Sequence, residues 1–227
     1  MMSKKWMRGL VVSVVLLWAA VASAATTLTA DQALSQLMAG NASFVKGKVP
    51  HLASMSTVSV RQSLAAGQSP YAIILACSDS RVPPEILFDR GLGEIFIIRV
   101  AGNVVAPHEL GSIEYALEHL GVPLIMVLGH ERCGAVTAAA DWAGEVLPEN
   151  IYSIIDSILP AVYSVQAKHT YATHDEYVDQ CIVENIKLVT KQLTTDSHLI
   201  KEFFELGKVK IVKGKYDLDD GKVRLIQ

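Results

Sequence analysis

Cys77, His130 and Cys133 are the residues whose types and positions best suit metal chemistry. Cys77 follows the apolar run 71–75, and His130 and Cys133 follow the apolar run 124–128 with His-x-x-Cys spacing. Both segments predict a strand, a loop and then a helix. In an open α/β sheet, side chains at the carboxyl ends of separate strands meet in one crevice. The sequence therefore predicts that two sulfurs and one imidazole converge there.

This donor set favours zinc. Thiolate and imidazole ligands suit Zn²⁺ better than Mg²⁺ or Ca²⁺, and three protein ligands leave the fourth tetrahedral position open, as in catalytic sites. A structural site would usually supply four ligands, whereas the chain has three cysteines and no Cys-x-x-Cys pair. The third, Cys181, falls in a predicted helix over 175–194 and is interpreted as a small buried hydrophobe. Spacing alone leaves open the alternative of two core thiols and an unrelated histidine.

Asp79 and Arg81 follow the first cysteine within four residues. Charged side chains in such a turn either reach solvent or pair with each other. If paired, Arg81 can keep Asp79 ionised through a bidentate hydrogen bond, which leaves the carboxylate able to accept a proton or hydrogen bond from a zinc-bound water. An ordinary surface ion pair is the alternative.

Three stretches together resemble the β-class carbonic anhydrases: residues 77–84 (CSDSRVPP), 114–117 (EYAL) and 129–134 (GHERCG). The resemblance runs to Tyr216 and Gly221 near the carboxyl end. It implies reversible, zinc-dependent hydration of carbon dioxide to bicarbonate and a proton by zinc-bound hydroxide. It also implies that Cys77, His130 and Cys133 ligate one Zn²⁺ per chain while Asp79 and Arg81 assist.

Some members of this family close the site by moving the aspartate onto zinc. Those that stabilise the closed state with bicarbonate at a second site share a tryptophan three residues before the first zinc cysteine. This chain has Ile74 there, while Arg99 and Tyr216 match two further positions of that group. The missing tryptophan favours a permanently open site. The resemblance also implies at least a homodimer, formed through the sheet and an exchanged amino-terminal helix.

The amino terminus resembles a secretory signal peptide. Lys4, Lys5 and Arg8 precede the apolar stretch 9–20, and the small residues 22–24 offer a cleavage site. The apolar run is shorter than the ~20 residues of a membrane-spanning helix. We therefore expect residues 1–24 to be removed and residues 25–227 to form the carbonic anhydrase domain, periplasmic or secreted, with no stable membrane span.

Removal of that segment would change the formal net charge from −3 to −6, because three cations are lost and no anions. The mature chain has no basic patch, so nucleic acid is not an expected partner. An oxidising compartment favours disulfides, and Cys77 with Cys133 would be the obvious pair. Export and metal binding together therefore require that zinc protects the two thiolates.

The fold is predicted to be a single α/β domain with a mostly parallel central sheet flanked by helices. Apolar strands are expected at 71–76, 95–100, 124–128 and 209–212, buried on both faces, with an edge strand at 223–226. Thr29 and Gln32 predict a capping box that opens a helix whose apolar face includes Leu34, Leu37 and Met38. Cys133 is expected to open another helix, over 134–142, whose dipole favours its thiolate.

Residues 149–206 predict helices broken at Pro160 and around 169–174. Gly102, at the end of the second strand, is expected to line the active site because glycine permits close backbone approach, and Gly134 is assigned to the same substrate lining. The remaining histidines lack ligand spacing and are interpreted as solvated: His51, His108, His119, His169, His174 and His198.

Two other functions stay open from the sequence. One is hydrolysis of carbon disulfide or carbonyl sulfide on the same zinc scaffold. The other is a non-catalytic zinc-binding or thiol-redox protein, which would not need the paired Asp79 and Arg81.

Overall fold

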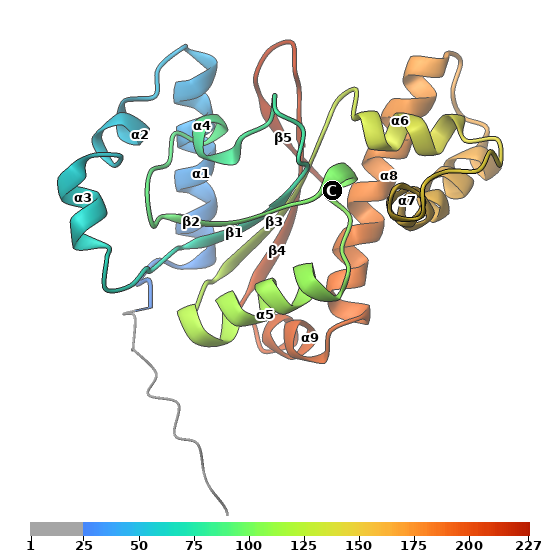
Figure 1. Ribbon diagram of the computed structural model, residues 1–227. Helices are drawn as coiled ribbons and strands as arrows, with labels where there is room; N and C mark the ends of the chain where they lie inside the picture. Colours follow the sequence, from blue (N-terminus) through green and yellow to red (C-terminus); the bar gives the residue numbers. More distant parts are fainter. Residues whose placement is uncertain (1–24) are drawn as a thin grey trace, which may run out of the picture.

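A computed structural model describes residues 25–227. Its centre is a five-stranded sheet in the order β2-β1-β3-β4-β5 (Figure 1). The strands are β1 (Ala72–Ala76), β2 (Ile95–Arg99), β3 (Leu124–His130), β4 (Lys210–Tyr216) and β5 (Val223–Ile226). The first four are parallel and β5 runs antiparallel to β4. The predicted α/β class is confirmed.

The central strands owe their burial to continuous apolar sequence. Every residue of β1 and β3 is buried, as expected for a parallel sheet that is covered on both faces. The expectation of full burial is wrong for β2, an edge strand whose first four residues are partly buried and whose last residue, Arg99, is exposed. It is also wrong for β4, where Lys210 is exposed and Ile211 and Val212 are partly buried. β3 extends two residues beyond the predicted end, so His130 is the last residue of a strand.

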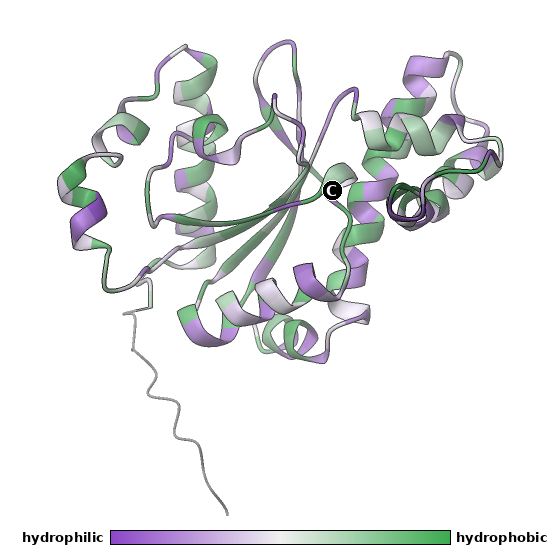
Figure 2. Ribbon diagram, viewed as in Figure 1, coloured by the Kyte–Doolittle hydropathy of each residue, from purple (hydrophilic) through white to green (hydrophobic). Residues whose placement is uncertain are grey.

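Nine α-helices and one 3₁₀ helix surround the sheet within residues 25–227. They are α1 (Ala30–Val45), α2 (Pro50–Ser54), α3 (Val58–Ser63), α4 (Pro84–Leu87), η1 (Ala101–Asn103), α5 (Pro107–Leu120), α6 (Gly134–Asp141), α7 (Glu149–Lys168), α8 (His174–Thr195) and α9 (His198–Glu205). α1 and α4 lie on one face of the sheet, and α5, α8 and α9 cover the other (Figure 1). The sheet forms the green apolar centre of Figure 2, with purple polar residues mainly on the helices around it.

The amino-terminal helix begins as predicted. Thr29 caps α1, and its side chain and that of Gln32 exchange hydrogen bonds with each other's backbone amides. Leu37 is fully buried, while Leu34 and Met38 pack against the core. The predicted capping box and apolar face are therefore confirmed.

The predicted break at Pro160 is wrong, because α7 continues through this residue. Proline cannot donate a backbone hydrogen bond, and its ring crowds the carbonyl one turn earlier. The proline is exposed, while its neighbours Ile158, Leu159 and Val162 are buried in the core, so packing holds the helix together. The second predicted break is present, between the end of α7 at Lys168 and the start of α8 at His174.

The predicted signal peptide, residues 1–24, lies outside the described residues. Within residues 25–227, none of the helices combines the length and apolar character needed to cross a membrane.

Candidate metal centre

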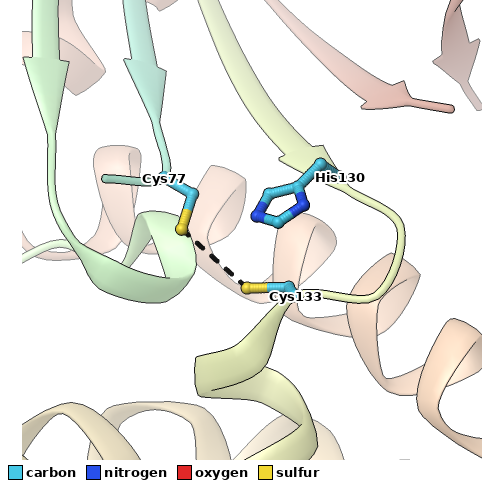
Figure 3. Close-up of side chains that lie close together, drawn as sticks. All are labelled: Cys77, His130 and Cys133. Atoms are coloured by element: carbon cyan, nitrogen blue, oxygen red, sulfur yellow. Dashed lines mark hydrogen bonds between the residues drawn. The ribbon is translucent and has the colours of Figure 1, made fainter. Parts of the chain in front are cut away.

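Three separate elements bring the predicted ligands together at the carboxyl ends of β1 and β3. Cys77 directly follows β1, His130 ends β3, and Cys133 is the N-cap of α6. β1 and β3 are neighbours in the sheet, so their ends lie side by side. The two cysteine side chains and the imidazole point toward one another (Figure 3). All three are buried.

The distances fit a tetrahedral zinc ion. The Sγ atoms of Cys77 and Cys133 are 3.9 Å apart, and the candidate ligand atoms of the three residues all lie within 4.8 Å of one another. Two thiolates at the usual Zn–S length of about 2.3 Å and a tetrahedral angle would be about 3.8 Å apart. A disulfide would need about 2.05 Å. The cysteines are free thiols at the separation that zinc ligation requires.

His130 provides independent support for a metal. Its Nδ1 is 2.8 Å from the carbonyl oxygen of Glu131, which sets the tautomer that leaves Nε2 as a lone-pair donor. Nε2 is buried and has no hydrogen-bond partner among the described residues. A buried, unpaired imidazole nitrogen costs free energy, and a metal ion between the two sulfurs would remove that cost.

The two thiols differ in acidity because they lie so close together. A hydrogen bond from Cys133 is the largest of the effects that lower the pKa of Cys77, to about 4, and the backbone amides of Asp79 and Gly102 also donate to its sulfur. The pKa of Cys133 is raised by the adjacent Cys77 and by burial. Hydrogen bonds from the backbone amides of Ala135 and Val136, at the start of α6, lower this pKa as expected, but their effect is smaller than that of Cys77 and burial. A cation is needed before both sulfurs can be thiolates together.

Asp79 and Arg81 form the predicted pair. Arg81 Nε donates to Asp79 Oδ1 at 2.9 Å, and Nη2 donates to Oδ2 at 2.7 Å. The backbone amide of Arg81 also donates to Oδ1 at 2.9 Å. These hydrogen bonds lower the pKa of Asp79 to about 2, so the carboxylate is ionised at neutral pH. Its Oδ2 lies 3.9 Å from His130 Nε2 and so faces the candidate metal site.

Arg99 has a role that sequence reasoning missed. Its Nε donates to the carbonyl oxygen of Cys77 at 2.9 Å, and its Nη2 donates to that of Asp79 at 2.6 Å. It therefore fixes the loop that carries both groups. The sequence feature that could have indicated this role is a cation at the end of an apolar strand. Ile74 is fully buried in β1, and Tyr216 pairs with His130 across the sheet.

The two predicted substrate-lining glycines lie in different surroundings. Gly102 is buried, has a φ of +68°, and donates its amide to Cys77 Sγ at 3.3 Å. A Cβ there would lie 2.8 Å from Ile158 Cδ1, so only glycine fits without a shift. Gly134 is the exposed first residue of α6, and a Cβ there would meet no atom within 4 Å. Their contact with substrate stays a prediction.

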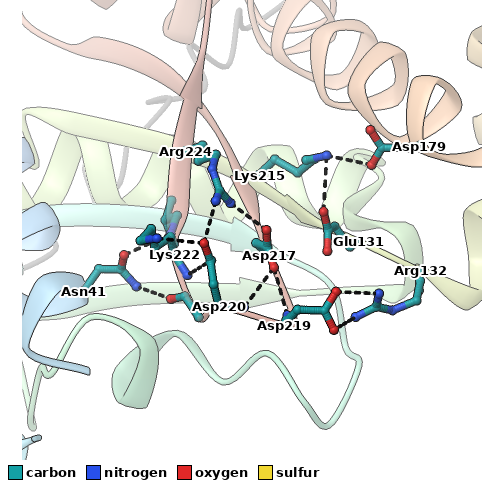
Figure 4. A network of polar contacts seen from close by, with 12 residues as sticks. Asn41, Glu131, Arg132, Asp179, Lys215, Asp217, Asp219, Asp220, Lys222 and Arg224 are labelled. Carbon is teal, nitrogen blue, oxygen red and sulfur yellow. Dashed lines mark hydrogen bonds and ion pairs between the residues drawn. The ribbon is translucent and has the colours of Figure 1, made fainter. Parts of the chain in front are cut away.

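Arg132, between the second and third ligands, was also missed. Its backbone has a φ of +50°, and its side chain binds both carboxylate oxygens of Asp219 at 2.9 Å (Figure 4). Its carbonyl oxygen accepts from Arg81 Nη2 at 3.2 Å. The β4–β5 turn is thereby connected to the ligand loop. The pairing spans 87 residues, so no local sequence pattern indicates it.

A second group of candidate ligands lies in the same network: Glu131, Asp217 and Asp219. Each already pairs with a cation, respectively Lys215, Arg224 and Arg132. Cys181 is fully buried in α8, and burial raises its pKa to about 11, as suits the predicted small core residue. Within residues 25–227, His130 is the histidine that belongs to a group of three candidate ligands.

Comparisons with known proteins agree on one family. The sequence pattern of the family described as carbonic anhydrase matches residues 72–223. Carbonic anhydrase 2 of Mycobacterium tuberculosis is 40% identical over 191 residues, which cover 83% of this chain and 89% of that protein. The carbonic anhydrase of Mycolicibacterium smegmatis is 40% identical over 188 residues, or 82% and 88% of the two chains. The solved structure of the β-carbonic anhydrase CcaA superposes with a TM-score of 0.70 at 26% identity, covering 86% and 95%.

Proposed function

The chain belongs to the β-class carbonic anhydrases, and we propose that it catalyses the zinc-dependent, reversible hydration of carbon dioxide to bicarbonate and a proton. The observation that carries the proposal is the buried trio of Cys77, His130 and Cys133, with its unpaired imidazole nitrogen beside an ionised carboxylate. Three ligands leave one tetrahedral position for the reacting water.

A zinc ion bound at this centre would supply chemistry that is common to many zinc enzymes. Zinc held by three protein ligands lowers the pKa of a water in its fourth position, so that a nucleophile is available near neutral pH. The standard protein example of this effect is itself a carbonic anhydrase, one whose zinc is held by three histidines. Two thiolates neutralise more of the charge of zinc than imidazoles do, so they should lower the pKa of the bound water less. The hydrogen bond from that water to the carboxylate of Asp79 is therefore more important here.

Asp79 accepts a hydrogen bond from the nucleophilic water and orients it toward carbon dioxide. Its low pKa means that it stays ionised, so it acts as an acceptor across the neutral range. Arg81 holds the carboxylate through two side-chain hydrogen bonds and also binds the carbonyl of Arg132. Arg81 thus connects the loop after β1, which carries Asp79, to the loop after β3, which carries Arg132.

We infer that the site remains open. Both oxygens of Asp79 are engaged by Arg81, which restrains the carboxylate from moving onto the metal. Ile74 supports the same inference, because the members of the family whose closed state is stabilised by bicarbonate carry tryptophan there. If Asp79 instead closed onto the metal, activity would vanish at neutral pH and return in alkali, which a pH series of hydration rates would reveal.

Export is the second part of the proposal. Residues 1–24 are a cleavable signal peptide, and the mature enzyme works in the periplasm or outside the cell. Amino-terminal sequencing of the protein recovered from a periplasmic fraction tests this directly, since the proposal requires Ala25 as the first residue. A full-length chain retained in the membrane fraction would contradict it.

A homodimer or larger homo-oligomer is the third part. The outer edge of β2 has no partner strand among the described residues. The neighbouring helices α2 and α3 have no buried residues, and Ile86, Leu92 and Tyr115 are large exposed apolar side chains. Such a surface suits association with a second copy. Light scattering on the purified mature chain should give at least twice its monomer mass.

The activity itself is tested by stopped-flow assay of the zinc-loaded mature chain with carbon dioxide, carbonyl sulfide and carbon disulfide in parallel. Fast hydration of carbon dioxide alone supports the proposal. Turnover restricted to the sulfur compounds would identify the related hydrolase. Zinc binding with no turnover would indicate a binding role, and readily alkylated thiols would indicate thiol-redox chemistry.

A further inference from the structure

Asn185 is an unusual residue for its position in α8. It is fully buried, and the residues one turn away on the same side of the helix, Cys181 and Val189, are fully buried too. Most neighbours on this face are apolar. An amide in such surroundings costs free energy unless its polar atoms are hydrogen-bonded. Its presence therefore needs a reason other than helix packing.

The side chain is only half satisfied. Asn185 Nδ2 donates to the carbonyl oxygen of Gly102 at 2.8 Å, across 83 residues of sequence. Its Oδ1 is buried and has no hydrogen-bond partner among the described residues. A leucine of similar shape would avoid this unsatisfied oxygen and favour the helix. A buried polar group that is left without a hydrogen-bond partner is often found where the residue supports a functional site.

The partner of Asn185 belongs to a turn that contacts the metal centre. Gly102 has a φ of +68°, and the next residue, Asn103, has a φ of +45° although it is not glycine. The amide of Gly102 donates to Cys77 Sγ at 3.3 Å. One glycine thus donates to a ligand sulfur through its N–H and is fixed by α8 through its C=O.

We propose that Asn185 is a positioning residue for the metal centre: it fixes the Gly102 turn so that the Gly102 amide stays on the Cys77 sulfur. This inference rests on the proposed zinc enzyme. An amide donor on a ligand thiolate withdraws charge from the sulfur and restricts its orientation. Loss of such supporting contacts typically weakens metal binding about 10- to 100-fold.

The test compares three variants of the mature chain loaded with Co²⁺ as a spectroscopic substitute for zinc. Asn185→Leu removes the amide and keeps the shape, and Asn185→Ala removes it if the leucine variant fails to fold. Val189→Ala is the matched control, because it leaves a cavity one turn away on the same helix and removes no hydrogen bond to Gly102. The readouts are the thiolate-to-cobalt charge-transfer band and the rate of metal release to a chelator.

Both Asn185 variants should shift the charge-transfer band to longer wavelength and release metal about tenfold faster or more, with Val189→Ala resembling the wild type. A general loss of stability would speed metal release without shifting the charge-transfer band, so the band is the readout specific to the positioning role. Bands and rates like the wild type in both Asn185 variants, or equal changes in Val189→Ala, would overturn the proposal. If the wild type itself shows no thiolate-to-cobalt band, the proposed metal site fails first, and this inference with it.

Discussion

Replacing Asp79 with asparagine removes one negative charge from the centre while keeping the shape of the side chain. Asp79 Oδ2 is 3.9 Å from His130 Nε2 and 2.7 Å from Arg81 Nη2. In Asp79→Asn, the new amide group must either face the donors of Arg81 or turn its NH₂ toward the reaction centre. In both orientations the nucleophilic water loses its anionic acceptor.

The magnitude follows from the geometry. A unit charge about 4 Å from a reacting charge contributes about 4 kcal/mol at an effective dielectric constant of about 20. The 3.9 Å between Asp79 Oδ2 and His130 Nε2 gives the scale of the separation between the carboxylate and the candidate metal site. Because each 1.36 kcal/mol is a tenfold change in rate, Asp79→Asn should slow hydration by about three powers of ten. General acid–base groups usually contribute about 10²–10⁴-fold, which brackets this value.

The assay is stopped-flow carbon dioxide hydration together with the zinc content of the same samples. Asp79→Asn should keep one zinc per chain, since Asp79 is not among the three ligands. Asp220→Asn is the control: its pKa is also lowered to about 2, chiefly by Lys222, and it pairs with Arg224, but it lies in the β4–β5 turn. A rate loss under tenfold in Asp79→Asn, or an equal loss in Asp220→Asn, would refute the assigned role.

Three further predictions concern the scaffold. Asn41→Ala should lower the free energy of unfolding by about 2–4 kcal/mol in chemical denaturation, because the buried amide makes three hydrogen bonds to backbone groups; a loss below about 1 kcal/mol would contradict this. Pro160→Ala should raise the melting temperature by about 2–4 °C, because it restores the backbone hydrogen bond to Asp156; a lower melting temperature would show that the proline stabilises α7. The pKa of His174 is raised by its hydrogen bond to Asp141, so this pair stabilises the fold below about pH 6.5 and the contribution is lost as pH rises through the folded-state pKa. His174→Gln should therefore lower the melting temperature near about pH 5.5 and have little effect near about pH 8.5, and the reverse pattern would refute the assignment.

Local sequence patterns were sufficient to place the strands and to predict that the three candidate ligands lie together. The apolar runs that became β1 and β3 are continuous because both faces of those strands are covered. The cysteines and histidine follow these runs directly, so topology alone brings them together. The prediction of full burial failed at β2, because exposure of an edge strand depends on its place in the sheet rather than on its own residues. It also failed at β4, where Lys210 is exposed and Ile211 and Val212 are partly buried.

Contacts between distant segments could not be predicted. Proline rules predicted a break at Pro160, but burial of the flanking apolar residues outweighs the lost hydrogen bond. The pairing of Arg132 with Asp219 and that of Asn185 with Gly102 each join segments more than 80 residues apart. The order of thiol acidity likewise depends on the 3.9 Å between Cys77 and Cys133.

The central claim is that a single zinc ion in this centre produces the activity. The most direct measurement is the rate of carbon dioxide hydration at neutral pH as the metal-free, fully reduced mature chain is titrated with zinc, with Cys77→Ala measured in parallel. The rate should rise linearly to one zinc per chain and then stay constant, and Cys77→Ala should gain no activity. No hydration by the wild type with one zinc bound, or full activity in Cys77→Ala, would contradict the account.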